Sequence, residues 1–294
     1  MFTTLVAVIA ALVLGHLAPA VMAAMRDWHW FGRWLAWLQA QGGWARGRFG
    51  LLPALVPLLL PVALLQWLLD ERLYGLPSLL YGIVVLVLCW GPRDLDRDVE
   101  AVIDADDAGS RAQATAHLRA AGGSMREDAA SLVDAVMFNA LRRWFAPLFW
   151  FLLLGPFGVA AYRLLAQAVQ GPQAARLSGA SHEGGSRALA VLEWPVAQLM
   201  ALSMALVGNF DTVFSAWRRA AGNRWALELD FLGEAARAGV GMELGEEAEE
   251  AREAGLVPID ECFPELRDAM SVVWRMLLLW MAVLALMIIA GWVG

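Results

Sequence analysis

Three side chains, two of them charged, stand in stretches that are largely apolar, and their placement most suggests chemistry. Tyr162 and Arg163 lie in the run 145–169, and Glu193 lies in the run 188–210. An ionisable group at membrane depth is costly unless it faces a polar interior, so such residues are functional-site candidates. Arg163 is expected either to extend towards the membrane surface or to pair with Glu193. The alternative for Glu193 is an interfacial position at a helix start.

A second polar group comes directly before the run 145–169. Asp134 and Asn139 are followed by Arg142 and Arg143. An acid, an amide and two arginines near the mouth of a membrane helix can hold an anionic ligand, although the arginines can also serve only as interfacial anchors. We expect the two groups to converge on one cleft that is made by Asp134, Asn139, Tyr162, Arg163 and Glu193, with the anion held by Arg142, Arg143 and Arg163. The alternative, in which each residue anchors its own helix end, stays open.

A stripe of acids offers a weaker possibility, a metal site. At helical spacing Asp96, Glu100, Asp104 and Asp107 fall on one face, because residues three and four apart are neighbours. Clustered carboxylates can hold a divalent cation such as Mg²⁺. A solvated helix face is the more common reason for such a pattern. Asp96, Glu100 and Asp104 are therefore weak candidates for metal ligands.

Several kinds of chemistry are excluded by what the sequence lacks. All 22 basic residues are arginine, so a phosphate-binding loop lysine and a Schiff-base lysine are impossible. The two cysteines lie far apart, and no HExxH, GxGxxG or GxSxG motif occurs. The formal net charge of −7 and the sequence pI of about 5.2 argue against a nucleic-acid partner.

The composition predicts which elements must position these residues. Of the 294 residues, 60% are hydrophobic and only 17% are charged, and the mean hydropathy is +0.55. This balance is far from that of a soluble globular protein. It predicts a polytopic membrane protein that contacts the lipid bilayer directly.

Apolar runs of roughly 20 residues are long enough to cross a bilayer as helices. Five runs meet or approach this length: 2–25, 51–69, 76–90, 145–169 and 272–293. We expect the first to be a retained helix rather than a cleaved signal. A sixth run, 188–210, fits a spanning helix, a half-helix or an interfacial helix. The predicted fold is all-α, with about five or six membrane helices and cytoplasmic amphipathic helices.

The distribution of arginine predicts the orientation. The loop 25–50 holds four arginines against one acid, whereas the loop around 70–72 holds one arginine against two acids. The positive-inside rule places the first loop in the cytoplasm, and six crossings then place both termini outside. The expected regions are N-terminal membrane helices with a basic loop (1–90), a cytoplasmic helical region (91–144), central membrane helices (145–210), a second cytoplasmic helical region with an acidic run (211–271) and a C-terminal membrane helix (272–294).

Several short motifs lie along the chain, at 91–95, 142–150, 154–158, 161–163, 193–195 and 205–211, and Trp217 follows the last of them. In their order and spacing these motifs resemble the AmpE proteins, which are related to the CobD/CbiB membrane proteins of cobalamin biosynthesis. The resemblance extends from the third apolar run to residue 217 and includes the terminal membrane helix.

The resemblance implies an accessory or sensor protein of the bacterial inner membrane. Such a protein is linked to peptidoglycan recycling and β-lactamase induction, with a cell-wall fragment or other components of induction as partners. Two alternatives stay open. One is a CobD/CbiB-like nucleotide-dependent ligase, which would use Mg²⁺ and a nucleotide. The other is a transporter of a small anionic cell-wall fragment that uses Arg163 and Glu193.

This sequence differs from the motif of the CobD/CbiB enzymes, which bears on the ligase alternative. In those enzymes an acid-rich motif precedes the Ala146-Pro147 element. Its first acid and its asparagine fall on Asp134 and Asn139, but its other two acids fall on Phe138 and Arg142. Nucleotide-driven amide formation needs acids to hold Mg²⁺. The loss of these two acids therefore argues against an enzyme, and no catalytic residue is assigned.

Overall fold

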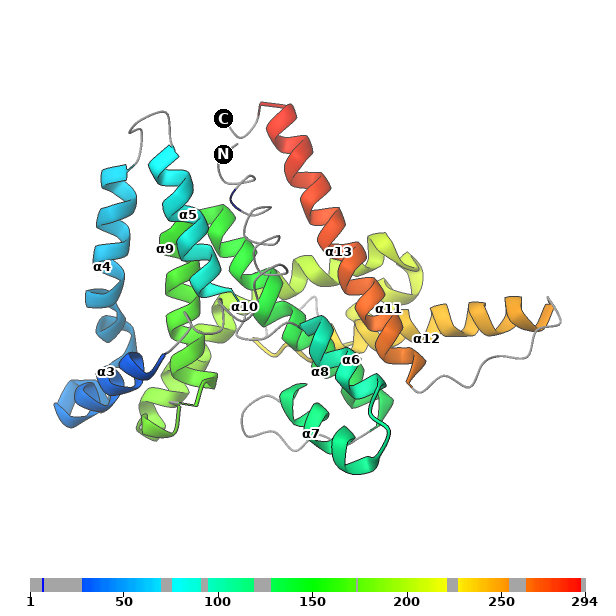
Figure 1. The fold of residues 1–294 in the computed structure, drawn as a ribbon, viewed down its shortest axis with the longest axis horizontal. Coiled ribbons are helices and arrows are strands. Elements are labelled where there is room, and N and C mark those ends of the chain that lie inside the picture. Colours follow the sequence, from blue (N-terminus) through cyan, green and yellow to red (C-terminus); the bar gives the residue numbers. More distant parts are fainter. Residues whose placement is uncertain are drawn as a thin grey trace. The chain divides into compact units, whose positions relative to one another are not determined.

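The computed structural model describes residue 7 and residues 28–69, 76–90, 95–118, 128–172, 174–220, 227–253 and 263–291, and the regular structure in these ranges is helical (Figure 1). The prediction of an all-α fold is confirmed for this part of the chain. The apolar run 2–25 lies outside the described residues, except for the buried Ala7.

Within these ranges, four helical stretches are long and apolar enough to cross a membrane. They are α4 (Leu51–Leu69), the stretch Ala129–Gln170, α10 (Gly179–Val207) and α13 (Pro264–Ile289). A shorter apolar helix is α5 (Leu76–Cys89). The chain is therefore a multi-pass membrane protein, and residues 188–207 of the ambiguous run 188–210 belong to a helix of spanning length.

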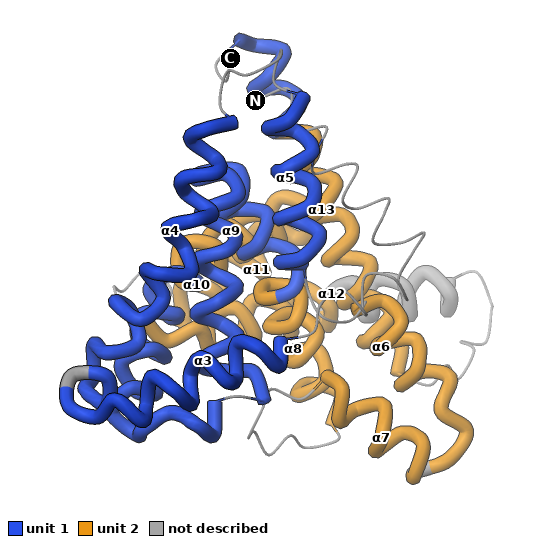
Figure 2. The backbone as a smooth tube through the Cα atoms, turned by 60° about the vertical axis from the view of Figure 1, so that its left-hand side comes forward, with its two compact units in different colours: residues 1–92, 143–193, 284–294 blue, residues 93–142, 194–283 orange. Residues whose placement is uncertain are grey.

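The chain divides into two compact units (Figure 2). The first unit consists of residues 1–92, 143–193 and 284–294, and the second consists of residues 93–142 and 194–283. The division falls between Arg142 and Arg143, inside a π-helical turn, Leu141–Phe145, that joins α8 (Ala129–Ala140) to α9 (Ala146–Gln170). π-Helical turns are rare and often mark functional sites.

In the first unit α4 and α5 both pack against α9 (Figure 1). The Tyr81 hydroxyl on α5 donates to the Val62 carbonyl on α4 at 3.1 Å. Leu60 and Trp67 on α4 are largely exposed, as expected for a helix whose outer face meets lipid rather than water.

The start of α10 is built onto the segment between α3 (His29–Ala40) and α4. The Ser181 hydroxyl donates to the Ala45 carbonyl at 3.1 Å, and the Ser178 hydroxyl donates to the Arg46 carbonyl at 2.8 Å. A Cβ atom at Gly184 would lie only 1.7 Å from the Arg48 carbonyl oxygen. Glycine is needed there because the two backbones approach so closely. This packing lets α10 begin nine residues before the apolar run.

In the second unit α12 (Asp230–Glu253) packs against both α8 and α11 (Phe210–Arg219). Two further helices, α6 (Leu95–Ile103) and α7 (Ala108–Leu118), pack against each other and against α8. Capping side chains define two helix starts, since Asp128 accepts from the Ser131 N–H at 3.3 Å and Asn209 accepts from the Thr212 N–H at 3.1 Å.

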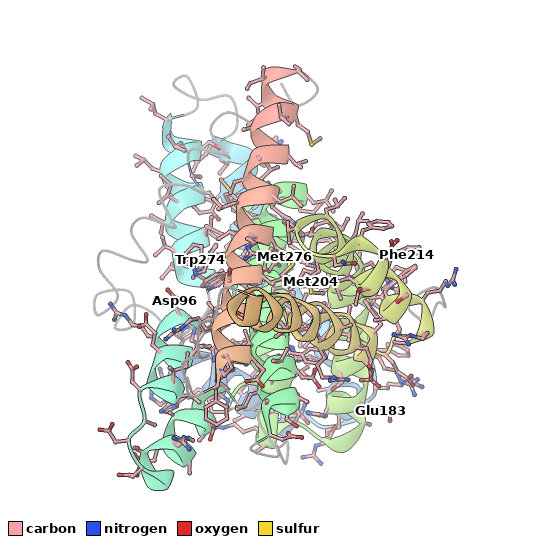
Figure 3. The ribbon with its side chains drawn as sticks, turned by 90° about the vertical axis from the view of Figure 1, so that its right-hand side faces the viewer. Asp96, Glu183, Met204, Phe214, Trp274 and Met276 are labelled. Carbon is pink, nitrogen blue, oxygen red and sulfur yellow. The ribbon has the colours of Figure 1, made fainter. Side chains whose placement is uncertain are left out.

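The last helix, α13, begins eight residues before the apolar run 272–293. Its indole groups connect it to two neighbours in the second unit. Trp274 donates to the Asp96 carboxylate on α6 at 3.3 Å (Figure 3), and Trp280 donates to the Ser203 hydroxyl on α10 at 2.9 Å. Met204 on α10 and Met276 on α13, both labelled in Figure 3, are buried.

Candidate functional site

Helix α9 is interrupted in its middle. Gly155 has φ 67° and ψ −153°, and Pro156 follows it. This backbone conformation is accessible to glycine and strained for other residues. Proline cannot donate a backbone hydrogen bond, so the helical ladder is broken at this point. Broken membrane helices occur where other groups of the protein satisfy the freed backbone atoms.

The side-chain amide of Gln66 on α4 bonds the backbone groups that the break in α9 leaves free. Its Nε2 donates to the Leu154 carbonyl at 3.2 Å, and its Oε1 accepts from the Phe157 N–H at 2.8 Å. The amide thus bonds one backbone group on each side of the break. A Cβ atom at Gly155 would lie 2.9 Å from Gln66 Nε2. The glycine therefore also makes room for the amide.

Two turns beyond the break, Tyr162 points its hydroxyl to Glu193 on α10. The hydroxyl donates to the carboxylate at 3.3 Å, and both side chains are buried. Glu193 lies in the middle of a 29-residue helix, so it does not mark a helix start. Tyr162 is thus a neighbour that bonds its carboxylate, and among the described residues no ion pair joins Arg163 to Glu193.

Arg163 is the most informative residue of this region. Only 6% of it is exposed, and its Nε makes no hydrogen bond to any described residue. The guanidinium lies close enough to Tyr162, Cys89 and Arg143 to interact with them electrostatically. Arg143 and Cys89 are themselves buried. The first unit therefore holds two buried guanidinium groups near a buried tyrosine that bonds a buried carboxylate.

Asp134 belongs to the second unit, where its carboxylate pairs with Arg237 on α12. Arg237 also reaches Glu234 at 2.7 Å. A Cβ atom at Gly233 would lie 2.5 Å from Asp134 Oδ1. Asp134 on α8 thus contacts both Arg237 and Gly233 on α12. These contacts give Asp134 a role in the packing of the two helices.

Asn139 and Arg142 also lie in the second unit. The Asn139 side-chain amide donates to the carbonyls of Leu118 and Ala135, each at 2.8 Å. The Arg142 guanidinium lies over the Phe138 ring, 5.7 Å from its centroid. Phe138 and Arg142 stand at the two positions where the ligase branch carries acids, and here they form a cation–π pair.

The acidic stripe does not gather into a metal site. Helix α6 ends at Ile103, so Asp104 lies beyond the helix that carries Asp96 and Glu100. Asp107 accepts a hydrogen bond from the Ser110 N–H at 2.6 Å, which lowers the pKa of its carboxyl below the ordinary value. In the part of the chain that the structure describes, no group of three or more His, Cys, Asp or Glu side chains is placed to hold a metal ion.

The structure thus divides the predicted residues between two units. The first unit brings together Arg143, Tyr162, Arg163 and Glu193; the second contains Asp134, Asn139 and Arg142. Sequence reasoning missed Gln66 and Cys89. Gln66 did leave a signal, because it is the only amide in the apolar run 51–69. Arg237 left none, because its partner lies 103 residues away.

Comparison with protein families gives a match over most of the chain. The model of the family described as "Regulatory signalling modulator protein AmpE" matches residues 49–254. The matched stretch contains the interrupted helix, Gln66 and the buried residues around Arg163. No curated protein and no solved structure matches the chain. Since the family model covers well over half of the sequence, the chain belongs to the AmpE family of regulatory signalling modulators.

Proposed function

We propose that this protein is an accessory or sensor of the bacterial inner membrane, linked to peptidoglycan recycling and β-lactamase induction. In this proposal the first unit binds a small anionic ligand, namely an acidic cell-wall fragment. Membership of a family of regulatory signalling modulators supports the regulatory part. The chemistry of the buried residues supports the anionic ligand.

One observation carries the proposal: the buried Arg163 Nε without a hydrogen-bond partner among the described residues. An arginine in a membrane helix is costly, up to about 2.5–3.5 kcal/mol at the helix centre on insertion scales, and Arg163 lies seven residues before the end of α9. A buried donor without a partner costs about 1–3 kcal/mol more. A chain that tolerates both costs in one helix is expected to offset them when a partner binds, and the partner that suits a guanidinium is an anion.

The charges of the region favour the same kind of ligand. Arg143 and Arg163 carry two positive charges, and Glu193 carries one negative charge when ionised. The buried guanidinium of Arg163 supplies a positive charge that suits an anionic ligand. Cell-wall fragments bear carboxylates on their peptide stems, and an arginine binds a carboxylate through parallel hydrogen bonds. No comparable argument favours the ligase alternative, because an arginine and a phenylalanine occupy two of its acid positions.

A binding measurement with the full chain in lipid nanodiscs tests the proposal. The probe is a mixture of acidic muropeptides released from peptidoglycan, and the readout is the thermal unfolding temperature. Arg163→Gln is the test variant. The matched control is Arg187→Gln, because Arg187 is also on a helix of the first unit but is exposed and pairs with Glu183 at 3.0 Å.

We expect the muropeptides to raise the unfolding temperature of the wild type and of Arg187→Gln. They should leave the unfolding temperature of Arg163→Gln unchanged. The same variants are then compared for inducible β-lactamase activity in a strain that lacks the gene. Equal shifts in all three proteins would contradict the role of Arg163. Normal induction without the gene would contradict the link to β-lactamase.

A further inference from the structure

Helix α11 presents a row of aromatic rings at the surface of the second unit. Phe210 and Phe214 stack with their ring centroids 5.3 Å apart, and Phe214 stacks on Trp217 at 5.3 Å. Phe210 is 47% exposed and Phe214 is 38% exposed. Figure 3 labels Phe214 on this helix. Spacings of four and three residues place the three rings on one face.

The neighbouring face of α11 packs against other helices of the second unit. Val213 and Ala216 are buried, and α11 packs against α12. The Trp217 indole N–H donates to the Gln198 side chain on α10 at 2.8 Å. These contacts fix the rotation of α11 about its axis. The exposed positions of Phe210 and Phe214 therefore follow from the packing of the helix.

The aromatic row continues a lipid-facing surface. Helix α10 has the length and composition of a membrane span, and in the half that belongs to the second unit Leu199, Leu202 and Leu206 are all more than 40% exposed. Only Gly208 and Asn209 separate α10 from α11. A surface that meets acyl chains along α10 is therefore followed at once by Phe210 and Phe214.

The charges at the other end of the helix suit a membrane surface. Arg218 and Arg219 form the last turn of α11 and are exposed. Amphipathic helices with aromatic residues on one side and arginines on the other bind in the plane of the interface. Arg219 lies away from the rings, whereas Arg218, four residues after Phe214, lies beside them and can extend its long side chain to the headgroups. Basic residues near the membrane are attracted by anionic headgroups.

We propose that α11 lies in the membrane–water interface, with Phe210 and Phe214 inserted at the acyl-chain boundary and Arg218 and Arg219 at anionic headgroups. The helix then acts as a lipid-binding element of the second unit. This inference does not depend on the ligand proposed for the first unit, because none of its residues belongs to that region.

Site-specific fluorescence quenching tests the proposal with the full chain. In a Cys89→Ser, Cys262→Ser background, a bimane label is attached at Phe210→Cys or, as the control, at Ser215→Cys. Ser215 is exposed and lies on the helix face away from the rings. The proteins are placed in nanodiscs of phosphatidylcholine with 30% phosphatidylglycerol, and the quenchers are a lipid with a doxyl group at carbon 5 and aqueous iodide.

We expect the doxyl lipid to quench the label at 210 at least twofold more than the label at 215, and iodide to show the reverse order. Replacing phosphatidylglycerol by phosphatidylcholine, or introducing Arg218→Gln with Arg219→Gln, is expected to weaken the doxyl quenching at 210. Equal access of iodide to both positions would overturn the interfacial placement and point to a protein partner on this face. Quenching at 210 that is insensitive to both lipid charge and the arginine variants would overturn the headgroup contact.

Discussion

The hydroxyl of Tyr162 donates a hydrogen bond to the carboxylate of Glu193, across 3.3 Å, inside the first unit. The bond joins the second half of the interrupted helix α9 to the middle of α10. It gives the buried carboxylate a neutral donor, while the adjacent Arg163 keeps a buried Nε without a partner among the described residues. This Nε is the donor that the proposed anionic ligand would bind.

Removing this hydroxyl is expected to destabilise the protein. Tyr162→Phe keeps the ring in its buried position but takes a donor from a buried carboxylate, which costs about 1–3 kcal/mol. The control is Tyr81→Phe, because Tyr81 donates to a backbone carbonyl in a half-buried place and its loss should cost about 1 kcal/mol or less. Unfolding by SDS in mixed micelles measures both. An equal loss of stability in the two variants would show that the Tyr162 hydrogen bond contributes no more to the free energy of unfolding than that of Tyr81.

The side chain of Gln66 is expected to hold the break in α9. Gln66→Leu keeps a similar volume but leaves the Leu154 carbonyl and the Phe157 N–H without this partner, at about 1–3 kcal/mol for each group that stays unsatisfied. The neighbouring Leu65→Ala, which changes an exposed residue on the same helix, should cost much less. The two variants are compared by the same SDS titration. If Gln66→Leu is as stable as the wild type, the amide does not support the break.

The close approach of α10 to the segment before α4 predicts a strong difference between two glycines. Gly184→Ala would place a methyl group 1.7 Å from the Arg48 carbonyl oxygen, whereas Gly179→Ala would meet nothing within 4 Å. We expect the first change to cost about 3 kcal/mol, at the upper end for overpacking. The second should be neutral or slightly stabilising, because alanine favours helix. Equal stability of the two variants would contradict the close packing of these backbones.

The pair of Asp134 and Arg237 is expected to act as a unit between α8 and α12. Both side chains are about 30% exposed, so the coupling should be modest, on the order of 1 kcal/mol. A double-mutant cycle of Asp134→Ala and Arg237→Ala measures it. Strictly additive effects on the free energy of unfolding would mean that the ion pair contributes nothing to the packing of these helices.

The membrane helices were predictable because they depend on local composition. The run 51–69 predicts α4 with the same bounds, and the runs 76–90 and 145–169 predict α5 and α9 to within one residue at each end. The starts of α10 and α13 lie eight or nine residues before their apolar runs. The start of α10 is rich in glycine, and tertiary contacts such as that of Ser181 with Ala45 support its helix there. The start of α13 is polar, with Pro264 and Glu265 as local helix-start signals that an apolar run does not include.

Some residues of the candidate site could be singled out from the sequence, but their arrangement could not. Polar side chains in apolar runs identified Arg163 and Glu193 because burial of charge is costly wherever it occurs. The Gly155-Pro156 pair likewise predicts a kink or a break. The partner of each group depends on which helices meet, and Gln66 reaches α9 across 88 residues of sequence. No local pattern carries that information.

The central claim is that Arg163 binds an anion inside the first unit. Native mass spectrometry tests it most directly, on protein taken from cells into nanodiscs without added ligand. The account predicts an anionic species bound to the wild type and to Arg187→Gln, and its loss from Arg163→Gln. The same bound species at the same occupancy in all three proteins would contradict the claim, as would the absence of any bound anion from the wild type.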